Sequence, residues 1–193
     1  MSIADIFADH AKVTARAAQE LPATLERIVK ALEECFRGGH KVFACGNGGS
    51  ASDAQHLVAE LIGRFLLERR SLPAVALTAD TATLTAISND YGYERVFARQ
   101  LEGLAQPGDL LFAISTSGNS RNVIEAATTA RGRGCVVVGM TGERGGNLAA
   151  HVSPELLIKA PSNVTARIQE VHSLCIHAIC DTLDPLIQHW PTP

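Results

Sequence analysis

The stretch Ser115 to Ser120 concentrates hydroxyl, glycine and amide groups directly after the apolar run at 110–114. A strand that gives way to such a turn at the start of a helix exposes backbone N–H groups and hydroxyls to one point. The helix dipole favours negative charge at that same point. The pattern therefore predicts an anion-binding loop, and we interpret the anion as a phosphate.

A second loop of this kind, Cys45 to Asp53, is rich in glycine and follows the apolar run at 41–45. It does not match the dinucleotide-binding pattern, because Ala51 stands where the third glycine is needed, and no Gly-Lys-Ser/Thr follows as in a P-loop. We therefore expect no nucleotide cofactor. Either loop alone is equally well explained as a capped strand-to-helix turn, but two such loops in one chain favour phosphate binding.

Two further groups carry side chains that could transfer protons or bind a metal. His56 and Glu60 are one helical turn apart on the same face, although such a pair is more often a solvated surface. Gln169 and His177 lie eight residues apart on a later helix, about 12 Å along its axis, so both reach one ion only by leaning together. His172 could equally be a hydrogen-bonded core histidine.

Short apolar segments alternate with helical patterns along the chain, which predicts a parallel sheet covered by helices on both faces. The helical stretch at 3–36 is divided by Pro22 and ends at Gly38-Gly39. A long helix is expected at 165–187, with an apolar stripe formed by Ile168, Val171, Leu174, Cys175, Ile179 and Leu183. The expected strands are 41–45, 74–77, 110–114, 135–140 and 155–158. Ligands of such sheets bind at the carboxyl ends of the strands, near the point where strand order reverses.

The composition limits the classes of protein to consider. With 193 residues, of which 46% are hydrophobic, the chain suits one domain spanning 1–193. A net charge of -3 gives no support to a nucleic-acid or membrane partner. The five cysteines contain no CxxC pair, and no apolar run approaches the roughly 20 residues of a membrane span. We expect a soluble, cytoplasmic protein.

The order of the motifs resembles the phosphoheptose isomerase family of sugar isomerase (SIS) domains, from about residue 3 to residue 187. The resemblance is carried by Cys45–Ser50, Gln55-His56 with Glu60, Asn89-Asp90-Tyr91, Gly108–Ser120, Thr141-Gly142 and Ala166–His172 with His177. It implies a flavodoxin-like, three-layer αβα sandwich around a five-stranded parallel sheet, with long N- and C-terminal helices. It also implies a homotetramer with sites between subunits, in which segment 1–38 packs in the oligomer.

The resemblance further implies roles for single residues. One zinc ion per subunit would be held by His56, Glu60, Gln169 and His177, with Glu60 and His177 also serving as the catalytic acid and base. Ala166 stands where some relatives carry a polar residue and is left out of the site. The phosphate would lie on Ser50 and the Ser115 loop, and the sugar hydroxyls on Asn47 and Asp90. The expected substrate-binding set is Asn47, Gly48, Gly49, Ser50, Glu60, Asp90, Ser115, Thr116, Ser117, Ser120 and Gln169.

The reaction that the family implies converts sedoheptulose 7-phosphate to D-glycero-D-manno-heptose 7-phosphate through an enediol, as the first step toward ADP- or GDP-heptose. Glu60 suits the removal of a proton from carbon, and His177, with an ordinary pKa near ~6.5, suits proton transfer at the oxygens. A zinc-bound carboxylate is a weaker base. Glu60 would therefore shift its coordination during turnover, or the metal would be partly structural.

Two alternatives remain open from the sequence. A non-catalytic SIS relative binds the replication initiator DnaA, but it lacks the equivalents of Glu60 and His177. A sugar-phosphate sensor would use the same loops for binding alone. Such sensors carry a DNA-binding domain, for which 193 residues leave no room.

Overall fold

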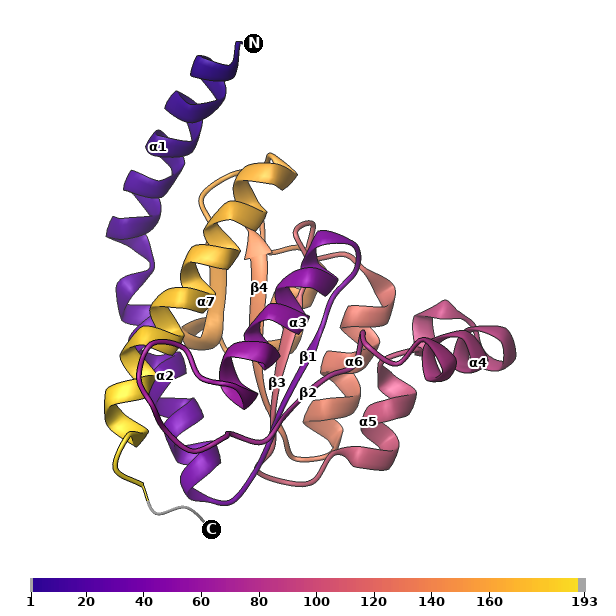
Figure 1. Ribbon diagram of the computed structural model, residues 1–193. Coiled ribbons are helices and arrows are strands. Elements are labelled where there is room, and N and C mark those ends of the chain that lie inside the picture. The colour runs from indigo at the N-terminus through magenta and orange to yellow at the C-terminus, as the bar shows by residue number, and fades with distance from the viewer. Residues whose placement is uncertain (1, 191–193) are drawn as a thin grey trace.

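Five parallel strands form the centre of the protein, whose computed structural model describes residues 2–190 (Figure 1). They lie in the order β2-β1-β3-β4-β5. Because β1 has β2 on one side and β3 on the other, the strand order reverses between β1 and β3. The predicted parallel sheet is confirmed, with strands β1 (Val42–Cys45), β2 (Ala74–Ala76), β3 (Leu110–Ile114), β4 (Val136–Gly142) and β5 (Leu157–Ala160).

Helices cover both faces of this sheet and complete the expected three layers. Side chains of β1 alternate between two cores: Val42 and Ala44 pack with α2, α3 and α7, whereas Phe43 and Cys45 pack with α5 and α6. The helices are α1 (Ile3–Glu20), α2 (Pro22–Arg37), α3 (Gly49–Ile62), α4 (Thr81–Tyr91), α5 (Ala98–Leu104), α6 (Arg121–Gly132) and α7 (Thr165–Ile187). Short 3-10 turns follow at Tyr93–Arg95 (η1), Asn147–His151 (η2) and Pro154–Leu156 (η3).

The element boundaries follow local chemistry, with two corrections to the predictions. Pro22 begins α2, where its missing N–H costs no hydrogen bond, and α7 has the predicted bounds. The last strand was predicted two residues too early, because Pro154 begins η3 before β5 starts. Leu174, predicted on the buried stripe of α7, is 47% exposed.

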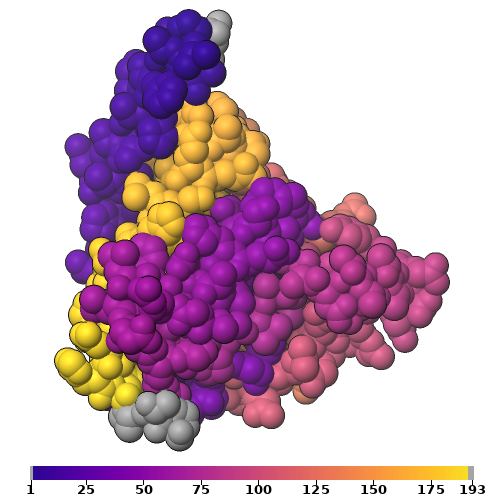
Figure 2. All heavy atoms as spheres, in the orientation of Figure 1, coloured from indigo at the N-terminus to yellow at the C-terminus, as the bar shows by residue number. Residues whose placement is uncertain are grey.

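Helix α1 projects beyond the rest of the molecule (Figures 1 and 2), and its N-terminal half contacts α7 through Arg167, which donates to the Ile6 carbonyl oxygen at 3.2 Å. Ile3 and Phe7 are 75% and 71% exposed on it. Arg16 ties its C-terminal half to the rest, donating to the carbonyl oxygen of Pro161 at 3.2 Å and to the Glu143 carboxylate at 3.0 Å. Within residues 2–190, no helix is long and apolar enough to cross a membrane.

Candidate functional site

The two glycine- and hydroxyl-rich loops meet at the carboxyl ends of β1 and β3, where Cys45, the last residue of β1, pairs with Ala113, one residue before the end of β3. The side-chain amides of Asn47 and Asn122 join the loops by two reciprocal hydrogen bonds of 2.9 and 2.8 Å. The hydroxyl of Tyr93 also donates to Asn47 Oδ1 at 3.1 Å. Asn47, expected to bind sugar hydroxyls, is therefore held in place by two residues that the sequence did not single out.

The loop after β3 is shaped to present hydroxyls at the start of α6. The Ser115 and Ser120 hydroxyls lie 2.9 Å apart, and no side chain caps the first N–H groups of α6. Gly118 has φ +67°, and a Cβ there would overlap the Gly145 carbonyl oxygen, so only glycine fits. The predicted geometry of an anion cradle, free N–H groups beside hydroxyls, is present.

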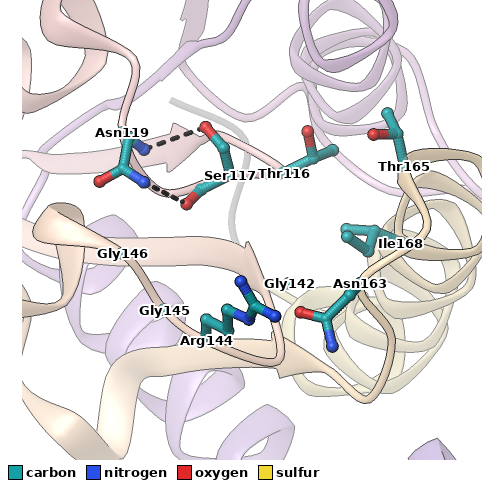
Figure 3. A pocket seen from close by; sticks show the side chains of 10 residues that line it. All are labelled: Thr116, Ser117, Asn119, Gly142, Arg144, Gly145, Gly146, Asn163, Thr165 and Ile168. Atoms are coloured by element: carbon teal, nitrogen blue, oxygen red, sulfur yellow. Dashed lines mark hydrogen bonds between the residues drawn. The ribbon is translucent and has the colours of Figure 1, made fainter.

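A pocket of about 390 Å³ lies between this loop and the segment after β4 (Figure 3). Thr116 and Ser117 form part of one wall, and Arg144 points toward the pocket from the other side. No hydrogen bond or ion pair within the described chain engages the Arg144 guanidinium. Its neighbour Glu143 is instead bound to Arg16. The sequence missed Arg144, since its signal is only a basic residue shortly after the quoted Thr141-Gly142.

Helices α3 and α7 run beside each other and bring the predicted acid, base and metal ligands into one seam. At the start of this seam, Gly49 is so close to the Gln169 side chain that a Cβ on residue 49 would overlap the Gln169 amide. One turn further, the Ser173 hydroxyl donates to Asp53 Oδ1 at 3.1 Å. The other Asp53 oxygen is buried without a partner, and burial raises the pKa of this carboxyl.

The next turn of the seam holds His56, Glu60 and His177. Nε2 of His56 lies 3.1 Å from Glu60 Oε1 and 3.2 Å from Nε2 of His177. The Phe65 ring stacks on the His177 ring, with centroids 5.5 Å apart. The side chains of His56 and Glu60 are 36% and 23% exposed, so water and ligands reach them. The structure thus brings together the three residues expected to transfer protons and bind metal.

The donor types in this cluster are those that zinc takes, namely imidazole nitrogens and a carboxylate oxygen. Their present arrangement does not close around one point, and no group of three His, Cys, Asp or Glu side chains in residues 2–190 is arranged to hold a metal ion. Gln169, the fourth expected ligand, lies two turns before His177 on α7, with its amide against Gly49. The chemistry of the set fits zinc, whereas its closure around an ion is not seen.

Two other predicted residues lie elsewhere. Asp90 is on α4, which projects from the side of the sheet, and its carboxylate accepts a hydrogen bond of 2.8 Å from Asn89 (Figure 1). It does not line the pocket beside Ser117. His172 is fully buried, and its Nε2 lies 3.1 Å from the Thr141 carbonyl oxygen, so it is the core histidine that the sequence left as an alternative.

Comparisons with known proteins show the family to which the chain is related. A family model described as the SIS domain matches residues 6–142. The phosphoheptose isomerase of Shewanella denitrificans is 50% identical, over 94% of this chain and 93% of its own. Among solved structures, the phosphoheptose isomerase from Neisseria gonorrhoeae is 44% identical with a TM-score of 0.90, covering 95% of this chain and 97% of that chain. One from Francisella tularensis is 38% identical with a TM-score of 0.91, covering 95% and 96%. The chain belongs to the phosphoheptose isomerase family of SIS-domain proteins.

Proposed function

We propose that this protein is an aldose–ketose isomerase that converts sedoheptulose 7-phosphate to D-glycero-D-manno-heptose 7-phosphate. The observation that carries the proposal is the cluster of Glu60, His56 and His177 on the seam that begins at the first loop. A site that only binds a sugar phosphate needs the cradle but not a carboxylate and an imidazole in proton-transfer contact. The relatives named phosphoheptose isomerase support the same activity.

The cradle supplies binding energy at the end of the sugar that does not react. A phosphate dianion is favoured by three kinds of group: the free N–H groups of α6, the Ser115 and Ser120 hydroxyls, and the Arg144 guanidinium. Binding the phosphate there positions the C1 and C2 atoms of the sugar for reaction. The residues predicted to bind the phosphate include no Lys or Arg, and Arg144 supplies this cation.

The residues of the α3–α7 seam carry out the proton transfer. Glu60 takes a proton from C1 of the ketose while the C2 oxygen gains one, which gives an enediol. A proton returned to C2, with loss of the proton on the C1 oxygen, completes the aldose. His177 exchanges protons with the two sugar oxygens as the carbonyl moves from C2 to C1. His56 contacts both groups through one nitrogen, and Phe65 holds the His177 ring from its other side.

We propose one zinc ion per subunit as the cofactor of this site, held by His56, Glu60 and His177 with Gln169 as the fourth ligand. When bound, zinc would supply Lewis-acid stabilisation of negative charge on the sugar oxygens. Support comes from the donor types and from the two spacings of 3.1 and 3.2 Å, close to the roughly 3.3 Å between neighbouring ligands of a tetrahedral zinc.

Two measurements test the proposal, deuterium incorporation for the proton transfer and metal removal for the zinc. Purified protein incubated with sedoheptulose 7-phosphate in D2O should yield the aldose with deuterium at C2, because a proton taken by Glu60 exchanges with water. Prior treatment with a chelator should abolish turnover, and added zinc should restore it. Failure to form the aldose with zinc supplied would contradict the isomerase activity, and full activity after metal removal would remove zinc from the proposal.

The oligomer and the place in metabolism are further proposals. We propose a homotetramer with sites between subunits, supported by the exposed apolar residues Ile3 and Phe7 on the projecting helix α1. The heptose phosphate would feed nucleotide-activated heptose synthesis, for lipopolysaccharide or another glycoconjugate, in the cytoplasm.

A further inference from the structure

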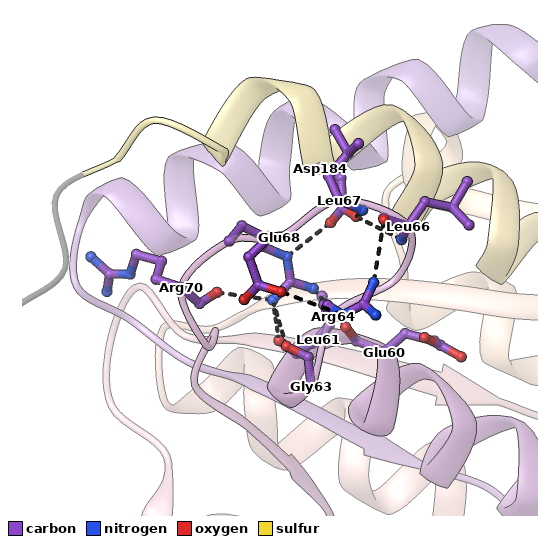
Figure 4. A network of polar contacts seen from close by, with 10 residues as sticks. Glu60, Leu61, Gly63, Arg64, Leu66, Leu67, Glu68, Arg70 and Asp184 are labelled. Carbon is purple, nitrogen blue, oxygen red and sulfur yellow. Dashed lines mark hydrogen bonds and ion pairs between the residues drawn. The ribbon is translucent and has the colours of Figure 1, made fainter.

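A buried ion pair lies at the far end of the α3–α7 seam (Figure 4). Arg69, in the segment after α3, donates from Nε to Asp184 Oδ1 on α7 at 2.8 Å. Their side chains are 1% and 2% exposed, so both charges are excluded from water. Replacing such a pair by apolar side chains is often neutral for stability, because the loss of solvation offsets the attraction. Stability alone therefore does not account for it.

The guanidinium of Arg69 holds the end of α3. It donates to the carbonyl oxygens of Glu60 at 2.6 Å and Leu61 at 2.8 Å, in the last turn of this helix. Carbonyl groups in the last turn have no partner within the helix, and a fixed cation satisfies them. The same turn carries the Glu60 carboxylate. Arg69 therefore fixes the backbone from which the proposed base projects.

The carboxylate of Asp184 holds the segment that covers His177. Its Oδ2 accepts the backbone N–H groups of Leu66 and Leu67, both at 3.1 Å (Figure 4). The residue before them is Phe65, whose ring stacks on His177 at an interplanar angle of 26°. Asp184 thus sets the position of the ring that lies against the proposed acid.

We infer that Arg69 and Asp184 are positioning residues, which fix the Glu60 end of α3 against His177 on α7. The pair touches neither the pocket nor the sugar-binding loops, and it acts through the backbone of Glu60 and through Phe65. The inference rests on the proposed isomerase activity for its kinetic consequence. Its geometric claim concerns the protein alone.

A second pair in the chain provides a matched control. Lys41 Nζ lies 2.8 Å from Asp109 Oδ2, and the Asp109 side chain is 1% exposed whereas that of Lys41 is 29% exposed. Like Asp184, Asp109 also accepts two backbone N–H groups, those of Lys41 at 3.0 Å and Gln106 at 2.8 Å. It precedes β3, at the amino ends of the strands and away from the seam.

The experiment compares two double variants, Arg69→Met with Asp184→Leu and Lys41→Met with Asp109→Leu, each assayed below its own Tm. The first should lower kcat for sedoheptulose 7-phosphate by about tenfold to hundredfold, as expected for a small misplacement of catalytic groups. Its KM and its Kd for inorganic phosphate should stay within about threefold of wild type, since the cradle is intact. The control should keep kcat near wild type. Equal loss of kcat in both variants, or none in the first, would overturn the inference.

Nuclear magnetic resonance provides a readout that does not depend on turnover. The ring protons of His177 should lose the ring-current shift of Phe65 in the Arg69→Met/Asp184→Leu protein but keep it in the control. The milder variants Arg69→Lys and Asp184→Asn should show the same change to a smaller extent if the double variant does not fold. Unchanged His177 shifts in folded variants would refute the positioning role even if the wild-type protein showed no isomerase activity.

Discussion

Glu60 and His177 contact the same atom, Nε2 of His56, from two different helices. The spacing of His56 and Glu60 made their contact predictable, because residues four apart share a helix face. The contact with His177 depends on how α3 and α7 pack, which no local pattern encodes. Arg144 and Phe65 were missed for the same reason, since each enters the site from a loop without a motif of its own.

Removing either proposed proton-transfer group should leave binding largely intact and slow the reaction. We expect Glu60→Gln and His177→Gln each to lower kcat by roughly 100-fold or more, the scale of general acid–base catalysis. Steady-state kinetics with the phosphorylated ketose measures this, and thermal unfolding checks that each variant folds. A variant that keeps a near-normal kcat would exclude its residue from the chemistry.

The Arg144 guanidinium should matter for the phosphate and not for the reacting carbons. Arg144→Gln should raise KM for the phosphorylated sugar by about tenfold or more, because a hydrogen bond to a charged group contributes roughly 1.5–3 kcal/mol. Arg133→Gln, at the opposite end of α6, serves as the matched control. Equal KM values for the two variants would remove Arg144 from the phosphate site.

At the scale of elements, the sheet and the long helices were predictable because their apolar patterns are strong and their ends carry Pro22 and Gly38. The strand order and the α3–α7 seam were not, since both depend on which elements pack together. The seam explains why Asp53, unremarkable in the sequence, is buried against Ser173. It also explains why Gln169 lies against Gly49 and not beside His177.

The packing of α7 on β4 should make stability depend on pH through His172. Burial lowers the pKa of this imidazole from 6.5 to about 4, since the charged form loses its solvation. In the unfolded chain His172 binds a proton below about pH 6.5, whereas in the folded protein it does so only below about pH 4. The free energy of unfolding therefore falls as the pH falls from about 6.5 to about 4. The slope contributed is up to about 1.4 kcal/mol per pH unit.

Chemical denaturation of wild type and His172→Gln between pH 7 and pH 4 measures this contribution. The free energy of unfolding should decline more steeply for wild type, because the variant lacks the titrating group while its amide can still donate to Thr141. Parallel curves for the two proteins would show that His172 does not titrate differently in the folded and unfolded states.

At the scale of the whole molecule, α1 is the element least explained by a single chain. Its N-terminal half contacts α7, where Arg167 donates to the Ile6 carbonyl oxygen at 3.2 Å and His10 pairs with Glu170 at 2.6 Å. Ile3 and Phe7 nevertheless stay exposed, and water is a poor environment for such a surface. A second copy of the chain covering this helix would bury both side chains, in agreement with the proposed tetramer.

Light scattering tests the proposed tetramer directly. The wild-type protein should have about four times the 20.5 kDa mass of one chain. Phe7→Asp should shift the population to smaller species, because it places a charge in the proposed interface. Lys12→Asp changes the charge of the same helix without removing an apolar side chain, and it should have the smaller effect. A monomeric wild type at micromolar concentration would contradict the proposal.

The most direct test of the central claim is the conversion itself. Purified protein supplied with zinc and sedoheptulose 7-phosphate should produce D-glycero-D-manno-heptose 7-phosphate. A coupled assay that detects the aldose measures this conversion. The Glu60→Gln protein, which keeps the cradle, should bind the ketose phosphate without converting it. Binding of the sugar phosphate by the wild-type protein with no aldose formed would contradict the account and identify the site as one for binding alone.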